Sequence, residues 1–352
     1  MKHILLSRDA FREGVFARDK NKCVFCGKTA EETPEGKLDA HHVIERKLWS
    51  DGGYYLANGA TVCEEHHMQC EMTVISVEDV REAAGITKAI VPDTMYDGHL
   101  YDKWGNPILA NKMRTRGPLF FDESVQKVLA KGQVLDLFTH HVKASKTMHL
   151  PFSPGIHDDD RVLRNYDGFE GREVVVTLKM DGENTSMYQD YFHARSVDGR
   201  GHPSRSWAKA LWGQICGDIP EQWRITGENV FAQHSIIYDD LESYFYGFGV
   251  WNERNRRLDW DDMLQWFELL GVHPAPVLWR GMWDEAIILD IAKGIDIVKN
   301  EGFVVTTVEG FEYGEYHSRV AKWVRPEHVQ TNKHWMHGQA IIPNKLKGSK
   351  DV

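Results

Sequence analysis

Four of the five cysteines of this chain lie near its N-terminus, and two of them, Cys23 and Cys26, form a Cys-x-x-Cys knuckle. A second pair, Cys63 and His66, has the spacing Cys-x-x-His. Two such pairs can supply the four ligands of a tetrahedral structural zinc site. The alternative is that they are ordinary small buried residues, as Cys70 would be. The spacing favours zinc, which would stabilise a module too small to fold well on its core alone.

Additional histidines that a zinc knuckle does not need lie around the second pair. His41 and His42 precede it, Asn58 lies between them and Cys63, and His67 directly follows His66. A neutral imidazole near pH 7 can take a proton from water, and a divalent ion can stabilise the charge that develops on a phosphate. These residues therefore suggest a second, catalytic use of the module.

Residues 11–75 resemble the HNH nuclease family, which has a ββα-metal fold. The resemblance implies that His42 is the general base acting on water and that Asn58 orients it. It also implies that His41 and His67 hold one catalytic divalent ion against the scissile phosphate. The open alternative is a module that has lost cleavage and only binds nucleic acid.

A lysine at the end of a predicted strand is the second chemical feature. The β-branched run over residues 173–179 ends in Lys179-Met180-Asp181-Gly182, a Lys-x-Asp-Gly motif. A desolvated lysine near other cations can lose its proton and attack an α-phosphate. Taken alone, the motif is weak, and Lys179 could equally be a surface lysine in a β-turn.

Five further elements follow this lysine in order. They contain Arg195, Glu228, the aromatic run 244–249, Glu301 and Lys322. Together with the lysine motif, they resemble the covalent nucleotidyltransferase superfamily, and most closely the ATP-dependent RNA ligases, over residues 145–340. The resemblance implies that ATP and Lys179 give a lysyl-AMP, that AMP passes to a 5′-phosphate end, and that a 3′-OH displaces AMP to join the strands.

The resemblance also assigns roles to the residues around the lysine. Asp181 would assist the leaving nucleotide or hold metal, and Arg195 would contact phosphate or the acceptor end. Glu228 would accept a hydrogen bond from the ribose, Glu301 would bind Mg²⁺ or Mn²⁺, and Lys322 would hold the α-phosphate.

An aromatic ring should stack on adenine, and Phe245 or alternatively Phe248 is expected to supply it. If the order of the motifs is ignored, both rings read as core aromatics. Lys322 is a sharper signal, because strand alternation places it on one face with Val320 and Val324. A charged side chain among valines suggests a ligand contact. Many ligases have two lysines in this last motif, so the second cation is either missing here or supplied by Arg325.

Patterns of residues predict the elements that position these groups. A capping box at Ser76 and Asp79 opens a helix that Gly85 ends. Another short helix is expected at 124–129, strands at 173–179, 244–251, 302–307 and 319–324, and helices at 261–270 and 283–292.

The predicted fold class is α+β. An HNH-like zinc module of residues 1–90 is followed by a connector of residues 91–144. A nucleotidyltransferase domain of antiparallel sheets and helices spans 145–340, and 341–352 form a basic, frayed tail. Too few residues follow Arg325 for the C-terminal OB-fold of DNA ligases and capping enzymes. This favours an RNA ligase.

Composition limits the class of protein further. The 42 Lys+Arg and 52 Asp+Glu residues give a net charge of −10, so any nucleic-acid contact must be a local basic patch. No apolar stretch is long enough to span a bilayer, and the hydrophobic run at the start is too short for a signal peptide. The odd number of cysteines suits a reducing compartment. We therefore expect a cytoplasmic protein with ATP, Mg²⁺ or Mn²⁺, and Zn²⁺ as cofactors and no membrane partner.

Three readings of function stay open. The first is an RNA ligase fused to an HNH nuclease, and the second is a ligase whose zinc module only binds nucleic acid. RNA is the expected substrate, with a DNA-joining ligase as the alternative. The third is a non-catalytic binding protein with decayed motifs, against which the intact set of ligase residues argues.

Overall fold

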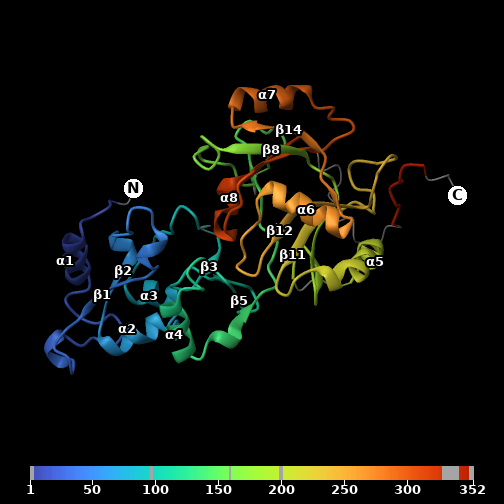
Figure 1. The fold of residues 1–352 in the computed structure, drawn as a ribbon. Coiled ribbons are helices and arrows are strands. Elements are labelled where there is room, and N and C mark those ends of the chain that lie inside the picture. Colours follow the sequence, from blue (N-terminus) through green and yellow to red (C-terminus); the bar gives the residue numbers. More distant parts are fainter. Residues whose placement is uncertain (1–3, 96–97, 158–159, 198–200, 327–340, 349–352) are drawn as a thin grey trace. The chain divides into compact units, whose positions relative to one another are not determined.

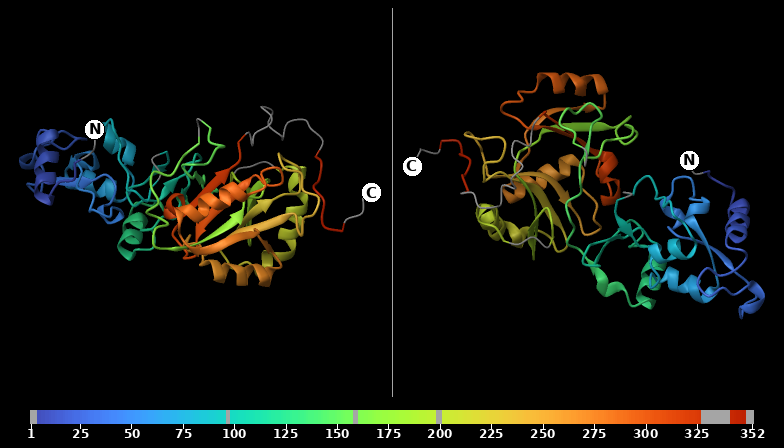
Figure 2. Two further views of the ribbon diagram at one scale, coloured as in Figure 1. Left: turned by 90° about the horizontal axis from the view of Figure 1, so that it is seen from above. Right: turned by 180° about the vertical axis from the view of Figure 1, so that it is seen from behind.

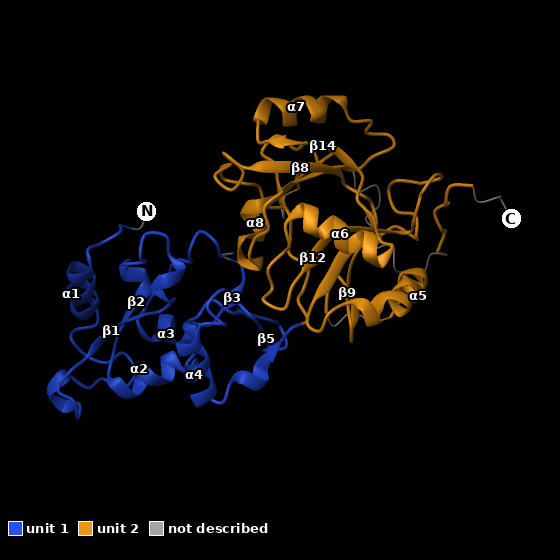
Figure 3. Ribbon diagram, viewed as in Figure 1, with its two compact units in different colours: residues 1–140 blue, residues 141–352 orange. Residues whose placement is uncertain are grey.

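The computed structural model describes residues 4–95, 98–157, 160–197, 201–326 and 341–348. The chain divides into two compact units, residues 1–140 and 141–352 (Figure 3). Among the described helices, none has the length and apolar character needed to cross a membrane.

The first unit combines short helices with two small sheets (Figure 1). Its helices are α1 (Arg8–Arg18), α2 (Glu64–Glu71), α3 (Val77–Ala83) and α4 (Glu123–Lys131). Its strands are β1 (Asp39–His42), β2 (Gly59–Val62), β3 (Leu100–Tyr101), β4 (Pro107–Ile108), β5 (Arg114–Thr115) and β6 (Phe138–Thr139). Short 3-10 turns lie at Ala30–Glu32, Arg46–Leu48, Leu56–Asn58 and Leu135–Leu137.

A ββα arrangement forms the centre of this unit. Strand β1 pairs antiparallel with β2, with His41 opposite Ala60 and His42 opposite Gly59. Helix α2 begins directly after β2, and α1 covers the sheet with the buried side chains of Phe11 and Val15. The histidines of β1 and of α2 are therefore brought to one place by the turn of the chain.

Residues 98–140 of the expected connector fold into structure of their own. Strands β3 to β6 form a four-stranded sheet, and α4 packs the buried Val125 and Leu129 against Trp104 and Phe120. The buried carboxylate of Asp102 accepts hydrogen bonds from Asn106 and forms an ion pair with Arg114 at 3.1 Å. This segment belongs to the first compact unit.

The second unit contains two five-stranded sheets, which Figure 2 shows from two further sides. One has the order β10-β9-β11-β12-β13 and the other the order β14-β8-β15-β16-β7. The strands of the first are β9 (Glu183–Tyr188), β10 (Phe192–Ala194), β11 (Arg224–Asn229), β12 (Phe245–Trp251) and β13 (His273–Pro274). Those of the second are β7 (Met148–His149), β8 (Glu173–Leu178), β14 (Val277–Met282), β15 (Gly302–Thr307) and β16 (Val320–Val324). The helices are α5 (Ser206–Ile215), α6 (Trp260–Leu270), α7 (Glu285–Gly294) and α8 (Tyr316–Arg319), and 3-10 turns lie at Pro203–Arg205, Cys216–Asp218 and Tyr313–Glu315.

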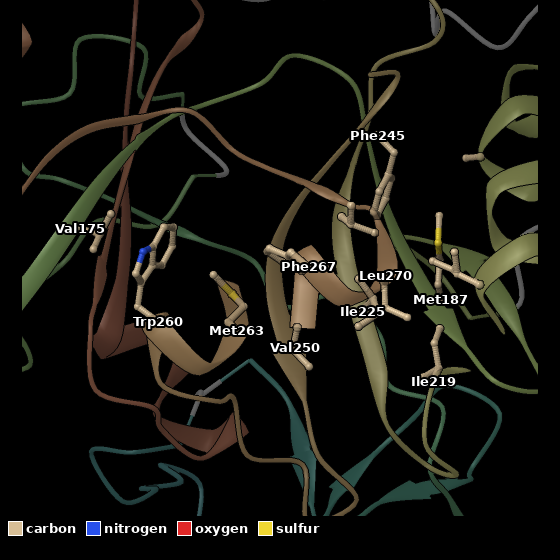
Figure 4. Packing of buried hydrophobic residues seen from close by; sticks show 13 residues of the cluster. Val175, Met187, Ile219, Ile225, Phe245, Val250, Trp260, Met263, Phe267 and Leu270 are labelled. Carbon is tan, nitrogen blue, oxygen red and sulfur yellow. The ribbon is translucent and has the colours of Figure 1, made fainter. Parts of the chain in front are cut away.

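Strand β8 is buried on both faces, which explains its continuous run of valines. Val174 and Val176 pack with Ile288 of α7 on one face. Val175 joins the other cluster, in which α6 packs on β11 and β12 (Figure 4). The two clusters fix the strand that ends at Lys179.

The predicted α+β class is confirmed, and so are the individual elements named from sequence. Helix α3 begins with the Ser76–Asp79 capping box, α4 contains the predicted 124–129 segment, and the predicted strands and helices of the second unit lie within a few residues of their expected bounds. The structure differs at the C-terminal end. The backbone N–H groups of Lys345 and Lys347 donate to the carbonyl oxygens of Tyr238 and Leu241, so these residues are tied to the second unit and not frayed.

Candidate active sites

The predicted zinc ligands lie together in the first unit. The donor atoms of Cys23, Cys26, Cys63 and His66 are all within 4.8 Å of one another. Cys26 Sγ and Cys63 Sγ are 3.9 Å apart, and Cys23 Sγ is 3.6 Å from His66 Nδ1. A tetrahedral zinc ion with ordinary bond lengths separates its ligands by about 3.5–3.8 Å. The donor set and these separations fit zinc, although Cys63 Sγ and His66 Nδ1 are closer, at 3.0 Å.

Removing zinc should unfold the first unit. We expect one zinc ion per chain by elemental analysis, and a lower unfolding temperature after chelation or in Cys26→Ser, because such a site contributes about 10 kcal/mol of binding free energy to folding. Cys216→Ser is the matched control, since Cys216 lies outside the cluster. A chain that contains no zinc and unfolds at the same temperature with and without chelator would contradict the assignment.

A cavity of about 470 Å³ lies at the histidines to which the HNH resemblance assigns catalytic roles. His41, His42 and His67 all line it, together with Glu71. His67 Nε2 is 3.3 Å and His41 Nδ1 is 3.6 Å from the same oxygen, Glu71 Oε1. Two imidazoles and a carboxylate within 4.8 Å are a suitable set for a divalent ion. Sequence reasoning missed Glu71, although its position four residues after His67 on one helix face was a usable signal.

The ring of His42 is held in place by aromatic neighbours. It stacks on Phe11 with centroids 4.7 Å apart and meets the edge of Tyr54 at 5.3 Å. Its Nε2 is buried and has no hydrogen-bond partner among the described residues. Burial, and then the positive charge of Lys103, lower the pKa of His42 to about 4, so the imidazole is neutral at pH 7.

Asn58 acts on the backbone next to these histidines. Its Oδ1 accepts from Ile44 N at 2.9 Å, and its Nδ2 donates to the carbonyl oxygens of Ile44 and Gly53. The buried amide thus fixes the chain that leaves β1 just after His42. The described contacts of Asn58 are with backbone, so any orienting effect on His42 is indirect.

Lys179 lies at the end of β8 and pairs with a buried carboxylate, Glu301. Its Nζ donates to Glu301 Oε2, and its backbone N–H donates to Gly302 O at 2.9 Å. Burial would lower the pKa of Lys179, but Glu301, Glu228 and Asp181 outweigh it and raise that pKa. The amine is therefore held as an ammonium in this form of the protein, whereas the sequence predicts a lysine that neighbouring cations help to deprotonate.

Glu228 is a second carboxylate of this site whose pKa is shifted. Burial raises its pKa to about 8, although Lys179 acts in the opposite direction. Glu301 is also buried, and burial raises its pKa despite the nearby Lys179. Two perturbed carboxylates and a lysine in one place are typical of a functional site.

Lys322 faces the same region from β16. It lies opposite Val304 of β15, which in turn lies opposite Thr177 of β8, so Lys322 and Thr177 share a face of the sheet. Burial, and then Lys179, lower the pKa of Lys322. Arg195 is exposed and also acts on this lysine electrostatically. The predicted cations therefore gather around Lys179.

Asp181 and the aromatic residues have surroundings that the sequence did not indicate. Asp181 Oδ2 accepts from Ser235 Oγ at 2.8 Å and from Ile236 N at 2.7 Å, so this carboxylate fastens the segment after β11. Phe245 is fully buried in the core beside α6 (Figure 4). Phe248 lies where the β11–β12 register shifts and is only partly buried, so it is the more accessible of the two rings.

Gly182, in the bend between β8 and β9, lies so close to β11 that a side chain does not fit there. A Cβ atom there would lie 2.4 Å from the carbonyl oxygen of Asn229 in β11. We expect Gly182→Ala to lower the free energy of unfolding by about 1–3 kcal/mol and to reduce reaction at Lys179 by displacing the end of β8. Thermal unfolding measures the first effect. The yield of AMP attached to the protein after incubation with ATP measures the second. Gly213→Ala is the control, because no atom lies within 4 Å of its added Cβ. If Gly182→Ala and Gly213→Ala have the same stability and the same yield of adduct, the close contact between Gly182 and β11 is not needed for either property.

Comparison with known proteins gives one family match within the second unit. Residues 172–324 match the model of the RNA ligase family. This segment begins just before β8 and ends with β16, so it includes Lys179, Glu228, Glu301 and Lys322. The predicted resemblance to RNA ligases is confirmed for this part of the chain. A comparison with curated proteins finds no match.

Several solved structures are similar to this chain at low identity. An archaeal ATP-dependent RNA ligase is 16% identical, with 53% of this chain and 48% of that one covered and a TM-score of 0.38. An RNA ligase from Naegleria gruberi with PPi is 18% identical, with 78% and 72% covered and a TM-score of 0.37. An ATP-dependent DNA ligase from Aquifex aeolicus, described as putative, is 18% identical, with 53% and 50% covered and a TM-score of 0.35. This chain thus spans about half the length of the archaeal enzyme, and at these TM-scores the likeness says nothing about substrate or mechanism.

Proposed function

We propose that this protein is an ATP-dependent RNA ligase that works through a lysyl-AMP intermediate. The observation that carries the proposal is the meeting of Lys179, Glu301 and Glu228 inside the segment that matches the RNA ligase family. Lys179 Nζ attacks the α-phosphate of ATP, a phosphoramidate bond forms, and pyrophosphate leaves. AMP is then transferred to a 5′-phosphate end, and a 3′-OH displaces it.

Glu301 has two roles in this proposal. It binds the ammonium of Lys179 before the reaction, and its carboxylate suits Mg²⁺ or Mn²⁺. A carboxylate engaged with such an ion stabilises the ammonium less, which favours the neutral amine that attack requires. Lys322 and Arg195 supply the positive charge that phosphoryl transfer needs.

The test is intact mass after incubation of purified protein with ATP and Mg²⁺, followed by a joining assay with 5′-phosphate RNA. A mass gain of one AMP and joined strands support the proposal. Joining of DNA in preference to RNA would replace it by the DNA-ligase alternative. No adduct on protein shown to be free of bound AMP would reject ligation.

We further propose that the first unit is a metal-dependent nuclease of the HNH type. The observation that favours it is the cavity in which His42, with its unpartnered Nε2, lies beside the His41–His67–Glu71 cluster. Arg8, Arg12 and Arg46 also line this cavity and suit a phosphate backbone. His42 would take a proton from the attacking water, and the divalent ion would stabilise the charge on the phosphate.

This second function is tested by incubating the protein with RNA and DNA in Mg²⁺ or Mn²⁺. Cleavage that EDTA stops and that His41→Ala removes supports the proposal. Binding of nucleic acid without cleavage of either substrate would favour a module that only binds.

A further inference from the structure

A buried lysine from outside the ββα element reaches the proposed nuclease cavity. Lys103 lies between β3 and β4, is only 4% exposed, and lines the cavity. Its Nζ is 3.0 Å from Glu71 Oε1 and 3.3 Å from Glu45 Oε2, and it donates to the carbonyl oxygen of His42 at 3.1 Å. Its own carbonyl oxygen accepts from Glu45 N. Contacts of both the side chain and the backbone thus fix the position of Lys103.

The ammonium of Lys103 competes for the oxygen that the divalent ion would need. Lys103 Nζ, His67 Nε2 and His41 Nδ1 lie around this one oxygen, Glu71 Oε1, at 3.0, 3.3 and 3.6 Å. Because the buried ammonium of Lys103 lies 3.0 Å from Glu71 Oε1, the negative charge of this carboxylate is already compensated. An ion that enters this cluster meets two imidazoles and a carboxylate whose charge Lys103 already balances.

The rest of the cavity is balanced in the same way. Its lining contains four basic side chains, Arg8, Arg12, Arg46 and Lys103, and four acidic ones, Asp9, Asp39, Glu45 and Glu71. Leaving histidine out of the count, the formal charge of the lining is zero. A divalent ion alone would therefore add uncompensated positive charge to a partly enclosed site, where charges are weakly screened.

We propose that Lys103 couples ion binding to substrate binding, so that the His41–His67–Glu71 cluster takes a divalent ion tightly only together with a phosphodiester. The inference rests on the proposed nuclease function. The phosphodiester brings the negative charge that the cavity lacks, contacts the ion, and gives the ammonium of Lys103 a further anionic partner besides Glu71 and Glu45. Such coupling is reciprocal, so the ion also strengthens binding of the strand.

The test measures Mn²⁺ binding to the full chain by electron paramagnetic resonance. The parent protein carries Glu301→Ala, to remove the ion site of the second unit, and His42→Ala, to prevent cleavage. We expect a short oligonucleotide to tighten Mn²⁺ binding by about tenfold or more in this parent. With Lys103→Met added, Mn²⁺ alone should bind about tenfold more tightly than to the parent, and the oligonucleotide should add less than about threefold.

Controls separate charge from structure. Lys103→Arg keeps the charge and should keep the coupling, and Lys47→Met removes an exposed lysine that pairs with Asp122 outside the cavity and should also keep it. If Lys103→Met does not fold, Lys103→Gln provides the neutral side chain and can still donate to His42 O. Equal or weaker Mn²⁺ binding in a folded neutral variant overturns the inference. Absence of any His41-dependent Mn²⁺ binding in the parent, with or without oligonucleotide, instead rejects the nuclease proposal.

Discussion

Replacing Lys179 by alanine is expected to abolish the AMP adduct, with a loss of about a thousandfold or more in the rate of adduct formation. The methyl group of alanine has no nitrogen to attack the α-phosphate. Lys322, the other lysine of the site, is fixed by its strand on β16 and does not end β8. Intact mass spectrometry after incubation with ATP and Mg²⁺ measures the effect.

Two variants make this result specific. Lys293→Ala removes a lysine of α7 whose side chain is 74% exposed, and it should leave the adduct unchanged. Lys179→Arg keeps a cation beside Glu301 but lacks a usable nucleophile, so it should fold and still give no adduct. An adduct of normal yield on Lys179→Ala would show that another residue is the nucleophile.

The strands that carry the ligase residues were predictable because their signals are local. The valines of β8 are bounded by Gly171 and Gly182, and β15 follows Glu301 with a glycine and β-branched residues. Gly182 and Gly302 are also places where a side chain would collide with a neighbouring strand. The glycines next to these β-branched runs therefore indicate, from the local sequence alone, where β8 ends and where β15 begins.

Parts of both sites could not be predicted because they depend on contacts between distant segments. Lys103 enters the cavity of the first unit from a segment that looks like a connector in sequence, and nothing nearby in the chain points to Glu71 as its partner. The buried position of Phe245 depends on packing against α6, and the register shift near Phe248 depends on pairing between β11 and β12. Sequence alternation within one strand cannot reveal either.

The groups proposed to react in the two centres are different residues in different units. His42 lies in the first unit and Lys179 in the second, and each has its own acidic residue suited to a divalent ion, Glu71 and Glu301 respectively. Loss of one reaction should therefore leave the other intact. Each catalytic variant is then the best control for the other.

Replacing His42 by alanine is accordingly expected to reduce metal-dependent cleavage by about 10²–10⁴-fold, the range for loss of a general base. The water would lose its proton acceptor, while the cluster of His41, His67 and Glu71 would still hold the ion. Binding of labelled RNA or DNA should be nearly unchanged, because the basic residues of the cavity rim remain. Cleavage rates and binding are measured on the same oligonucleotides.

The reciprocal controls decide between a nuclease and a binding module. His42→Ala should form the AMP adduct as the parent does, and Lys179→Ala should cleave as the parent does. Phe11→Leu removes the ring that stacks on His42 and should lower cleavage less than His42→Ala, because the base is displaced and not removed. Cleavage that persists in His42→Ala would exclude His42 as the base. Loss of binding together with cleavage would mean that the histidine supports the fold of the cavity and not the proton transfer.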